Sequence, residues 1–130
     1  RPNAFALGAQ TIALSTGLFN LVNTRDELAF VLAHELGHIA LGHSIESPAN
    51  LSPESQIEQH LKDEIQADRF AVQLMKNAGI APDSALDLLA RLSHGGNKNA
   101  KVRTNIYYTL SPRLNALKSL IFQNGNLPAI

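Results

Sequence analysis

The stretch Phe30–Ala40 constrains this chain most, because it places ionisable side chains inside an otherwise apolar run. Thr24 and Glu27 form a capping box ahead of it, and the pattern predicts a helix from about Arg25 to Leu41. Apolar residues cover most of the circumference of this helix, so we expect it to be central and buried. These residues are Ala29, Phe30, Val31, Leu32, Ala33, Leu36, Ile39 and Ala40.

Three ionisable residues in this helix, His34, Glu35 and His38, follow the pattern H-E-x-x-H. At about 100° per residue, both histidines lie on one face, one turn apart, so their imidazoles can reach one Zn²⁺ at about 2.0–2.1 Å. Glu35 lies on the neighbouring face, where we predict that it acts as general base toward a zinc-bound water and not as a ligand. This spacing is typical of zinc metalloproteases.

A second long helix is predicted to follow Ser52, which has the character of an N-cap, with Pro53 at the first helical position. The helix is predicted to end near Asn77, because Gly79 favours termination. One face of this helix carries an apolar stripe that we expect to be buried. The stripe contains Ile57, Leu61, Ile65, Val72 and Met75.

Two acidic residues, Glu64 and Asp68, interrupt this apolar stripe four positions apart. Carboxylates on a buried face need a cation or strong hydrogen-bond donors. Two histidines and a glutamate are a ligand set of catalytic zinc, which leaves the fourth coordination position open. We therefore predict one zinc ion on His34, His38 and Glu64. Asp68 is predicted to accept the outer N–H of a ligand histidine, most readily that of His34.

The remaining sequence predicts smaller elements around these two helices. Residues 4–7 and 11–16 have strand character and flank a turn, which indicates a hairpin whose second strand either covers the core or pairs with an extended substrate. A third helix is predicted from residues 81–83 and a fourth after a Ser111–Pro112 cap, whereas 44–52 and 93–101 are predicted loops. The fold class is therefore α+β and mainly helical, with a single domain over residues 1–130 and about four helices. We expect it to be a fragment of a longer precursor.

Composition excludes several kinds of site and partner. The 130 residues are 45% hydrophobic with a formal net charge of zero, which argues against a disordered chain and against nucleic acid or an anionic membrane as partner. Cysteine is absent, so thiolate ligands, disulfides and a cysteine nucleophile are excluded. No run of about 18 apolar residues occurs, so we expect no membrane span in this segment.

Three further histidines, His43, His60 and His94, need separate interpretation, because a closed structural zinc site would require one of them as fourth ligand. A metzincin pattern fails, since Leu41 and Ser44 occupy the positions that require Gly and His. His43 lies roughly 140° round the helix from His38 and is expected to point elsewhere. His60 is predicted to line the cleft or to close the metal site in a resting form, and His94 to lie in a loop.

With these motifs assigned, the chain resembles the catalytic domain of the M48 family of zinc metallopeptidases. The resemblance is carried by residues 3–6 and 16–18, by Glu27–His38, by the E-x-x-A-D segment Glu64–Asp68, and by residues 78, 79 and 82. It implies a zincin domain of the gluzincin type, endopeptidase activity on unfolded or misassembled proteins in protein quality control, and the zinc ligands assigned above. It also implies a cell-envelope setting.

One segment departs from the family pattern, which carries a His-Pro pair before the last helix to stabilise the tetrahedral intermediate. Here Pro112 and Arg113 are present, but the histidine is absent from Tyr107–Ser111. Tyr107, Tyr108 and Arg113 are the candidates for this role, and the loss of one such donor typically lowers the rate about 10²–10³-fold. The alternative function is therefore a zinc-binding but weakly active relative that serves as a protein-binding or chaperone-like module.

Overall fold

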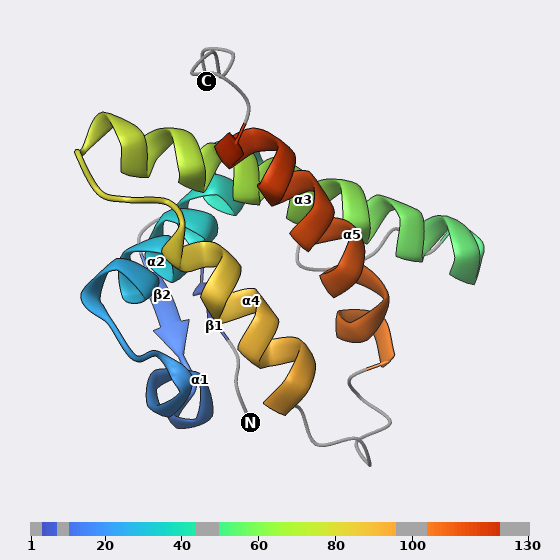
Figure 1. Cartoon of the computed structure of the whole chain (residues 1–130). Coiled ribbons are helices and arrows are strands. Elements are labelled where there is room, and N and C mark those ends of the chain that lie inside the picture. Colours follow the sequence, from blue (N-terminus) through green and yellow to red (C-terminus); the bar gives the residue numbers. More distant parts are fainter. Residues whose placement is uncertain (1–3, 8–10, 44–49, 96–103, 123–130) are drawn as a thin grey trace.

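The computed structural model describes residues 4–7, 11–43, 50–95 and 104–122. Within these residues two short strands, β1 (Ala4–Leu7) and β2 (Thr11–Leu14), precede five helices. The helices are α1 (Thr16–Leu21), α2 (Arg25–Ala40), α3 (Pro53–Asn77), α4 (Ser84–Gly95) and α5 (Thr104–Phe122), and Figure 1 shows their arrangement. The described part is therefore mainly helical, as the sequence predicts.

The strands β1 and β2 pair antiparallel, with Ala4 opposite Leu14 and Leu7 opposite Thr11, and β1 packs near α2. The predicted second strand is two residues too long, because Ser15 caps a helix there. The Ser15 hydroxyl accepts a hydrogen bond from the Leu18 N–H at 3.1 Å, and the Leu18 side chain is buried. The short helix α1 is thus missing from the sequence prediction, although a serine N-cap is its visible signal.

The ends of α2 and α3 agree with the predicted caps. The Thr24 hydroxyl accepts the Glu27 N–H at 3.1 Å at the start of α2. Ser52 accepts the Ser55 N–H at 3.2 Å at the start of α3, whose first turn contains proline. Gly79 has φ +74°, the left-handed conformation that ends helices. The two helices that carry the metal-ligand candidates are therefore confirmed within a residue of their predicted bounds.

The last two helices differ from the prediction. Helix α4 begins at Ser84 and continues to Gly95, so the backbone of His94 is helical and not in a loop. Helix α5 begins at Thr104 and carries Pro112 inside it, whereas proline was expected in its first turn. A proline inside a helix removes one hydrogen bond. The helix nevertheless continues, and the nearby Leu110 and Arg113 are both buried.

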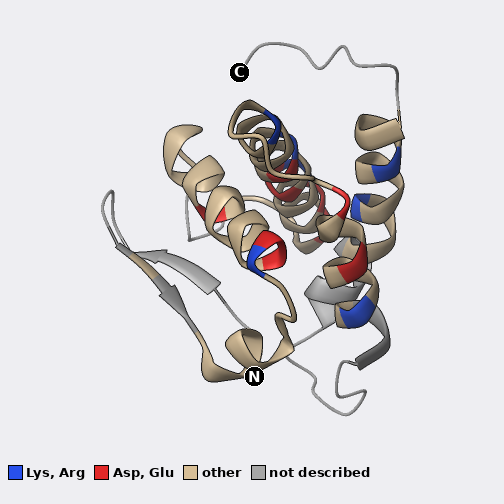
Figure 2. Cartoon of the chain, turned by 60° about the vertical axis from the view of Figure 1, so that its left-hand side comes forward, with Lys and Arg blue, Asp and Glu red and all other residues tan. Residues whose placement is uncertain are grey.

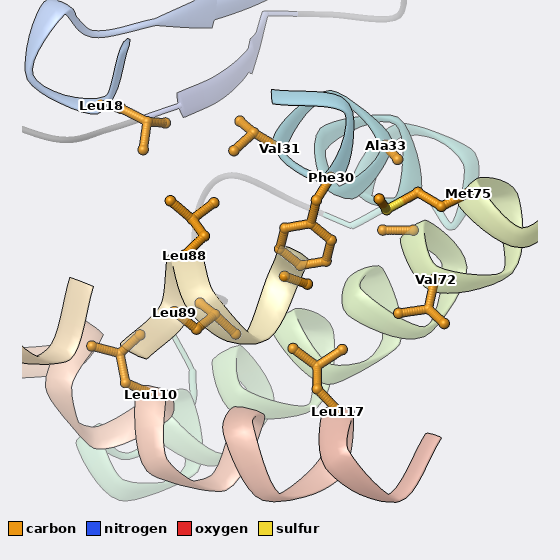
Figure 3. Packing of buried hydrophobic residues seen from close by; sticks show 12 residues of the cluster. Leu18, Phe30, Val31, Ala33, Val72, Met75, Leu88, Leu89, Leu110 and Leu117 are labelled. Atoms are coloured by element: carbon orange, nitrogen blue, oxygen red, sulfur yellow. The ribbon is translucent and has the colours of Figure 1, made fainter. Parts of the chain in front are cut away.

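The hydrophobic core lies between α2, α3, α4 and α5, and Figure 3 shows how its side chains meet. Phe30 projects from α2 toward α4, and Leu117 rises from α5 below it. Both are at most 2% exposed. The fully or almost fully buried side chains around them are Val72, Met75, Leu88, Leu89 and Leu110.

Helix α2 is central but not buried all round, which corrects the prediction. Leu32 and Leu36 are 37% and 43% exposed, because they form a row along the side of α2 that does not face the core. On the opposite side α2 packs closely on α3. A Cβ atom on Gly37 would lie 3.1 Å from both Cα and O of Ala67. Gly37 and Ala67 thus allow the two helices to approach within reach of a shared metal ion.

Charged residues are distributed over the helices, as Figure 2 shows, in keeping with the zero net charge. The buried Glu27 of α2 accepts hydrogen bonds from the Asn23 N–H at 3.0 Å and from Arg91 of α4. Arg91 also donates to the Leu21 carbonyl at 3.1 Å, so this ion pair fixes the entry to α2. Among the described helices, none combines the length and apolar character needed to cross a membrane.

Replacing Gly37 tests the close packing of α2 on α3. Gly37→Val is expected to destabilise the fold by about 1–3 kcal/mol, because the added atoms meet the backbone of Ala67, which can move only with all of α3. Urea unfolding in chelator measures this loss. Leu36→Val is the matched control, since it places the same β-branched residue on the exposed side of α2. Equal stability of the two variants would contradict the packing argument.

Candidate metal centre

Three side chains from two helices converge on one point. His34 and His38 come from α2, and Glu64 comes from α3. The Nε2 atoms of His34 and His38 are 3.0 Å apart, and each lies 3.1 Å from an oxygen of the Glu64 carboxylate. Among the described residues, this is the group of histidine and acidic side chains that could hold a metal ion. The structure thus brings together the three residues that the sequence proposes as ligands.

The outer nitrogen of His34 is held by Asp68. Its Nδ1 lies 2.8 Å from Asp68 Oδ1, and Asp68 is 1% exposed. A carboxylate can only accept, so the proton of a neutral His34 ring lies on Nδ1 and the Nε2 lone pair faces Glu64 and His38. This is the tautomer that a metal ion requires. Asp68 therefore lies where the sequence analysis expects the residue that orients His34.

Arg113 of α5 closes the centre from behind. Its guanidinium donates to Asp68 through two hydrogen bonds of 2.8 and 2.9 Å, and a third nitrogen lies 3.3 Å from Glu64 Oε2. The residue is 8% exposed, so both carboxylates are paired with a buried cation. The sequence makes Arg113 a candidate for stabilising the tetrahedral intermediate, and the structure directs its guanidinium to Asp68 and Glu64.

Buried charges shift one another strongly in this cluster. Burial lowers the pKa of His34, but the carboxylates of Glu64 and Asp68 outweigh it and raise the pKa to about 9. Burial raises the pKa of Glu64, but His34, His38 and Arg113 together hold it well below its ordinary value. The carboxylate of Glu64 is therefore ionised and available to a cation at neutral pH.

Glu35 lies beside this group without belonging to it. The side chain is 7% exposed, and burial raises its carboxyl pKa above the ordinary value, although the nearby His34 and His38 act in the opposite direction. A raised pKa makes an ionised carboxylate a stronger proton acceptor. The placement of Glu35 therefore suits proton transfer next to the three converging ligand atoms.

The position of His43 differs from the prediction. Its Nδ1 lies 2.9 Å from Nδ1 of His38, and its Nε2 lies 2.8 Å from Oε1 of Gln66. The helical-wheel estimate assumes that α2 continues, but the helix ends at Ala40 and Gly42 adopts φ +71°. The chain turns back there, and His43 meets the outer nitrogen of His38.

The other candidates lie outside the group of ligand atoms. His60 is exposed on α3, one turn before Glu64, and it is absent from the metal-ligand group of the described residues. Tyr107 and Tyr108 belong to helix α5, but the structure does not describe their side chains or that of His94. Residues 44–49 and 96–103, which contain most of the two predicted loops, are also outside the described part.

The donor set fits a metal ion of the zinc type. Two imidazole nitrogens and one carboxylate, all within 4.8 Å of one another, match the three protein ligands of an open site. Both outer histidine nitrogens have hydrogen-bond partners, as is usual for metal-bound histidines. The residues that could hold the ion are therefore His34, His38 and Glu64.

Comparison with known proteins gives partial matches. The model of peptidase family M48 matches residues 1–57. "Protease HtpX homolog" of Neisseria meningitidis serogroup B (strain ATCC BAA-335 / MC58) is 50% identical over 48 residues, which are 34% of this chain and 17% of the relative. "Protease HtpX" of Idiomarina loihiensis is 50% identical over 48 residues, covering 34% of this chain and 16% of the relative.

A third relative, "Metalloprotease YcaL" of Escherichia coli (strain K12), is 44% identical over 43 residues, which are 33% of this chain and 16% of the relative. The aligned part thus spans less than a fifth of each of these curated proteins. No solved structure matches the chain significantly. The family match contains His34, Glu35 and His38, whereas Glu64, Asp68 and Arg113 lie beyond its last residue.

Replacing Arg113 tests the buried ion cluster. Arg113→Met is expected to cost about 3–5 kcal/mol at neutral pH, because it leaves Asp68 and Glu64 buried without their cation. Arg113 helps hold the Asp68 pKa below its usual value, a contribution that is present at neutral pH and lost on acidification. The difference from wild type should therefore shrink below pH of about 4.

Urea unfolding at several pH values in chelator measures this difference. Arg69→Met is the matched control, since Arg69 is an exposed arginine on α3. If both variants lose the same stability, or if the loss is independent of pH, the ion cluster does not stabilise the fold as argued.

Proposed function

Since residues 1–57 match the model of peptidase family M48, we propose that the chain is the catalytic part of a zinc-dependent metalloendopeptidase. The observation that carries the proposal is the meeting of the His34 and His38 Nε2 atoms with the Glu64 carboxylate, beside the buried Glu35. His34, His38 and Glu64 would hold one zinc ion. When bound, zinc supplies a Lewis acid that polarises a carbonyl group and lowers the pKa of water.

The protein's own contribution begins with the orientation of these ligands. Asp68 fixes the His34 ring, and Arg113 neutralises Asp68 and Glu64 so that both remain ionised within the fold. Exclusion of solvent at this buried cluster strengthens each of these interactions. The three ligand atoms are therefore held in place by α2, α3 and α5 together.

Glu35 is the proposed general base. It accepts a proton from the attacking water and passes it to the leaving amine nitrogen of the cleaved peptide bond. Burial raises the carboxyl pKa of Glu35 above its ordinary value, which makes the ionised carboxylate a stronger proton acceptor.

The substrate is proposed to be an unfolded or misassembled protein or peptide, bound as an extended strand. In support, β2 belongs to a two-stranded sheet, so it has an edge that is not used by β1. A gluzincin-like fold, a role in protein quality control and a setting at the bacterial cell envelope belong to the same proposal, on the basis of family resemblance.

A second candidate function is a zinc-binding, weakly active relative that binds proteins. One observation favours it: Arg113, a candidate for stabilising the tetrahedral intermediate, is committed to Asp68 and Glu64. Together with the absence of histidine at residues 107–111, this leaves the intermediate without an assigned donor among the described side chains. Normal zinc binding without peptide cleavage would support this second function.

Replacing Glu35 tests the catalytic proposal. Glu35→Gln is expected to retain zinc and to lower cleavage of casein about 10²–10⁴-fold, because the amide cannot accept the proton. Zinc content by elemental analysis and casein cleavage with and without chelator are the measurements. Cleavage by wild type that survives chelation, or by Glu35→Gln at the wild-type rate, would refute the mechanism.

Replacing Glu64 tests the third ligand. Glu64→Ala is expected to abolish stoichiometric zinc binding and the zinc-dependent rise in melting temperature, since binding to the native state stabilises it. Glu58→Ala is the control, because it removes an exposed glutamate from the same helix. Unchanged zinc content in Glu64→Ala would rule out the three-ligand site.

A further inference from the structure

The end of helix α2 brings a third histidine onto the metal centre. The His43 N–H donates to the His38 carbonyl at 2.9 Å, and the Gly42 N–H donates to the Ile39 carbonyl at 3.2 Å. These two bonds, with Gly42 at φ +71°, are the Schellman arrangement of a helix C-terminus. In this arrangement the second residue after the cap contacts the third residue from the helix end. Here that pair is His43 and His38.

We propose that His43 is a positioning residue for His38, which it holds so that Nε2 of His38 is presented to the metal ion. The proposal rests on the proposed function, since it assumes that His38 is a zinc ligand. The two Nδ1 atoms are 2.9 Å apart, and the rings are inclined at 65° with centroids 5.1 Å apart. The His43 side chain is 9% exposed, so it is held within the fold.

The number of hydrogens on the two rings links the direction of this hydrogen bond to the state of His38. A neutral imidazole carries one N–H, so two facing Nδ1 atoms form a hydrogen bond only if one of them carries a proton and the other does not. If His38 donates from Nδ1, its Nε2 is an unprotonated lone pair that faces His34 and Glu64. If His43 donates instead, Nε2 of His38 carries the proton and cannot bind a metal ion. The state of His43 therefore selects the state of His38.

Two residues on α3 contact the far side of the His43 ring, and one of them, Asp63, favours the productive direction. Nε2 of His43 lies 2.8 Å from Oε1 of Gln66 and 3.6 Å from Oδ1 of Asp63. The Gln66 amide can donate or accept, but the Asp63 carboxylate can only accept. Asp63 thus favours a proton on Nε2 of His43, which leaves Nδ1 of His43 as the acceptor for His38. The chain of hydrogen bonds runs from His38 through His43 to α3.

The two histidine ligands are therefore held in different ways. His34 is oriented by a buried carboxylate that is itself paired with Arg113, whereas His38 is oriented by the imidazole ring of His43. Loss of an outer partner of a metal-bound histidine typically weakens metal affinity about 10–100-fold. We expect a loss of zinc affinity of this size when the acceptor nitrogen Nδ1 of His43 is removed.

A matched pair of variants tests the proposal. His43→Leu and His43→Asn both have a branched side chain with an atom in the place of Nδ1, but only asparagine offers an acceptor there. Zinc competition with a chelator at fixed pH should give a dissociation constant about 10–100-fold higher for His43→Leu. His43→Asn should stay within a few-fold of wild type. Circular dichroism melting in chelator reports whether each variant is folded.

Nuclear magnetic resonance of the zinc-loaded wild type gives a second, independent readout. Long-range proton–nitrogen spectra should show His38 protonated on Nδ1 and His43 protonated on Nε2, and this measurement does not depend on any variant folding. Equal zinc affinity of wild type and His43→Leu, equal losses in both variants, or protonation of His43 on Nδ1 would overturn the proposal. Failure of the wild type to bind zinc would instead overturn the proposed function.

Discussion

The contact of Asp68 with both His34 and Arg113 is the interaction on which the centre depends. Asp68 lies on α3, His34 on α2 and Arg113 on α5, so one buried carboxylate joins three helices. A buried carboxylate without partners would be costly, and here each of its oxygens accepts a charged or polar donor. The hydrophobic core places the helices near one another, but this contact fixes their rotation. The ligand atoms of the centre share one position only in that rotation.

Close approach of α2 and α3 is the second requirement, and small side chains supply it. Gly37 lies between the two histidine ligands on α2, and it faces Ala67, which lies between Glu64 and Asp68 on α3. A larger residue at either place would separate the histidines from their carboxylate. The sequence that supplies the ligands therefore also supplies the space between the helices that carry them.

Most of what lies within a single helix could be predicted from the sequence. The caps at Thr24 and Ser52 mark the starts of α2 and α3, and helical spacing alone relates His34 to His38. Contacts that depend on how a helix ends or on its neighbour could not be predicted in this way. A helical wheel turns His43 away from His38, because it does not include the reversal at Gly42.

Arg113 shows the same limit from another side. Its place after Pro112 favours a helix start, and a cation near a cleft is easily assigned to substrate, since sequence does not reveal which carboxylates it will meet. The structure gives Arg113 two buried acids as partners. Both acids lie beyond residue 57, where the family match ends. The motif on α2 is thus only half of the centre, and the charge balance that allows it to be buried comes from α3 and α5.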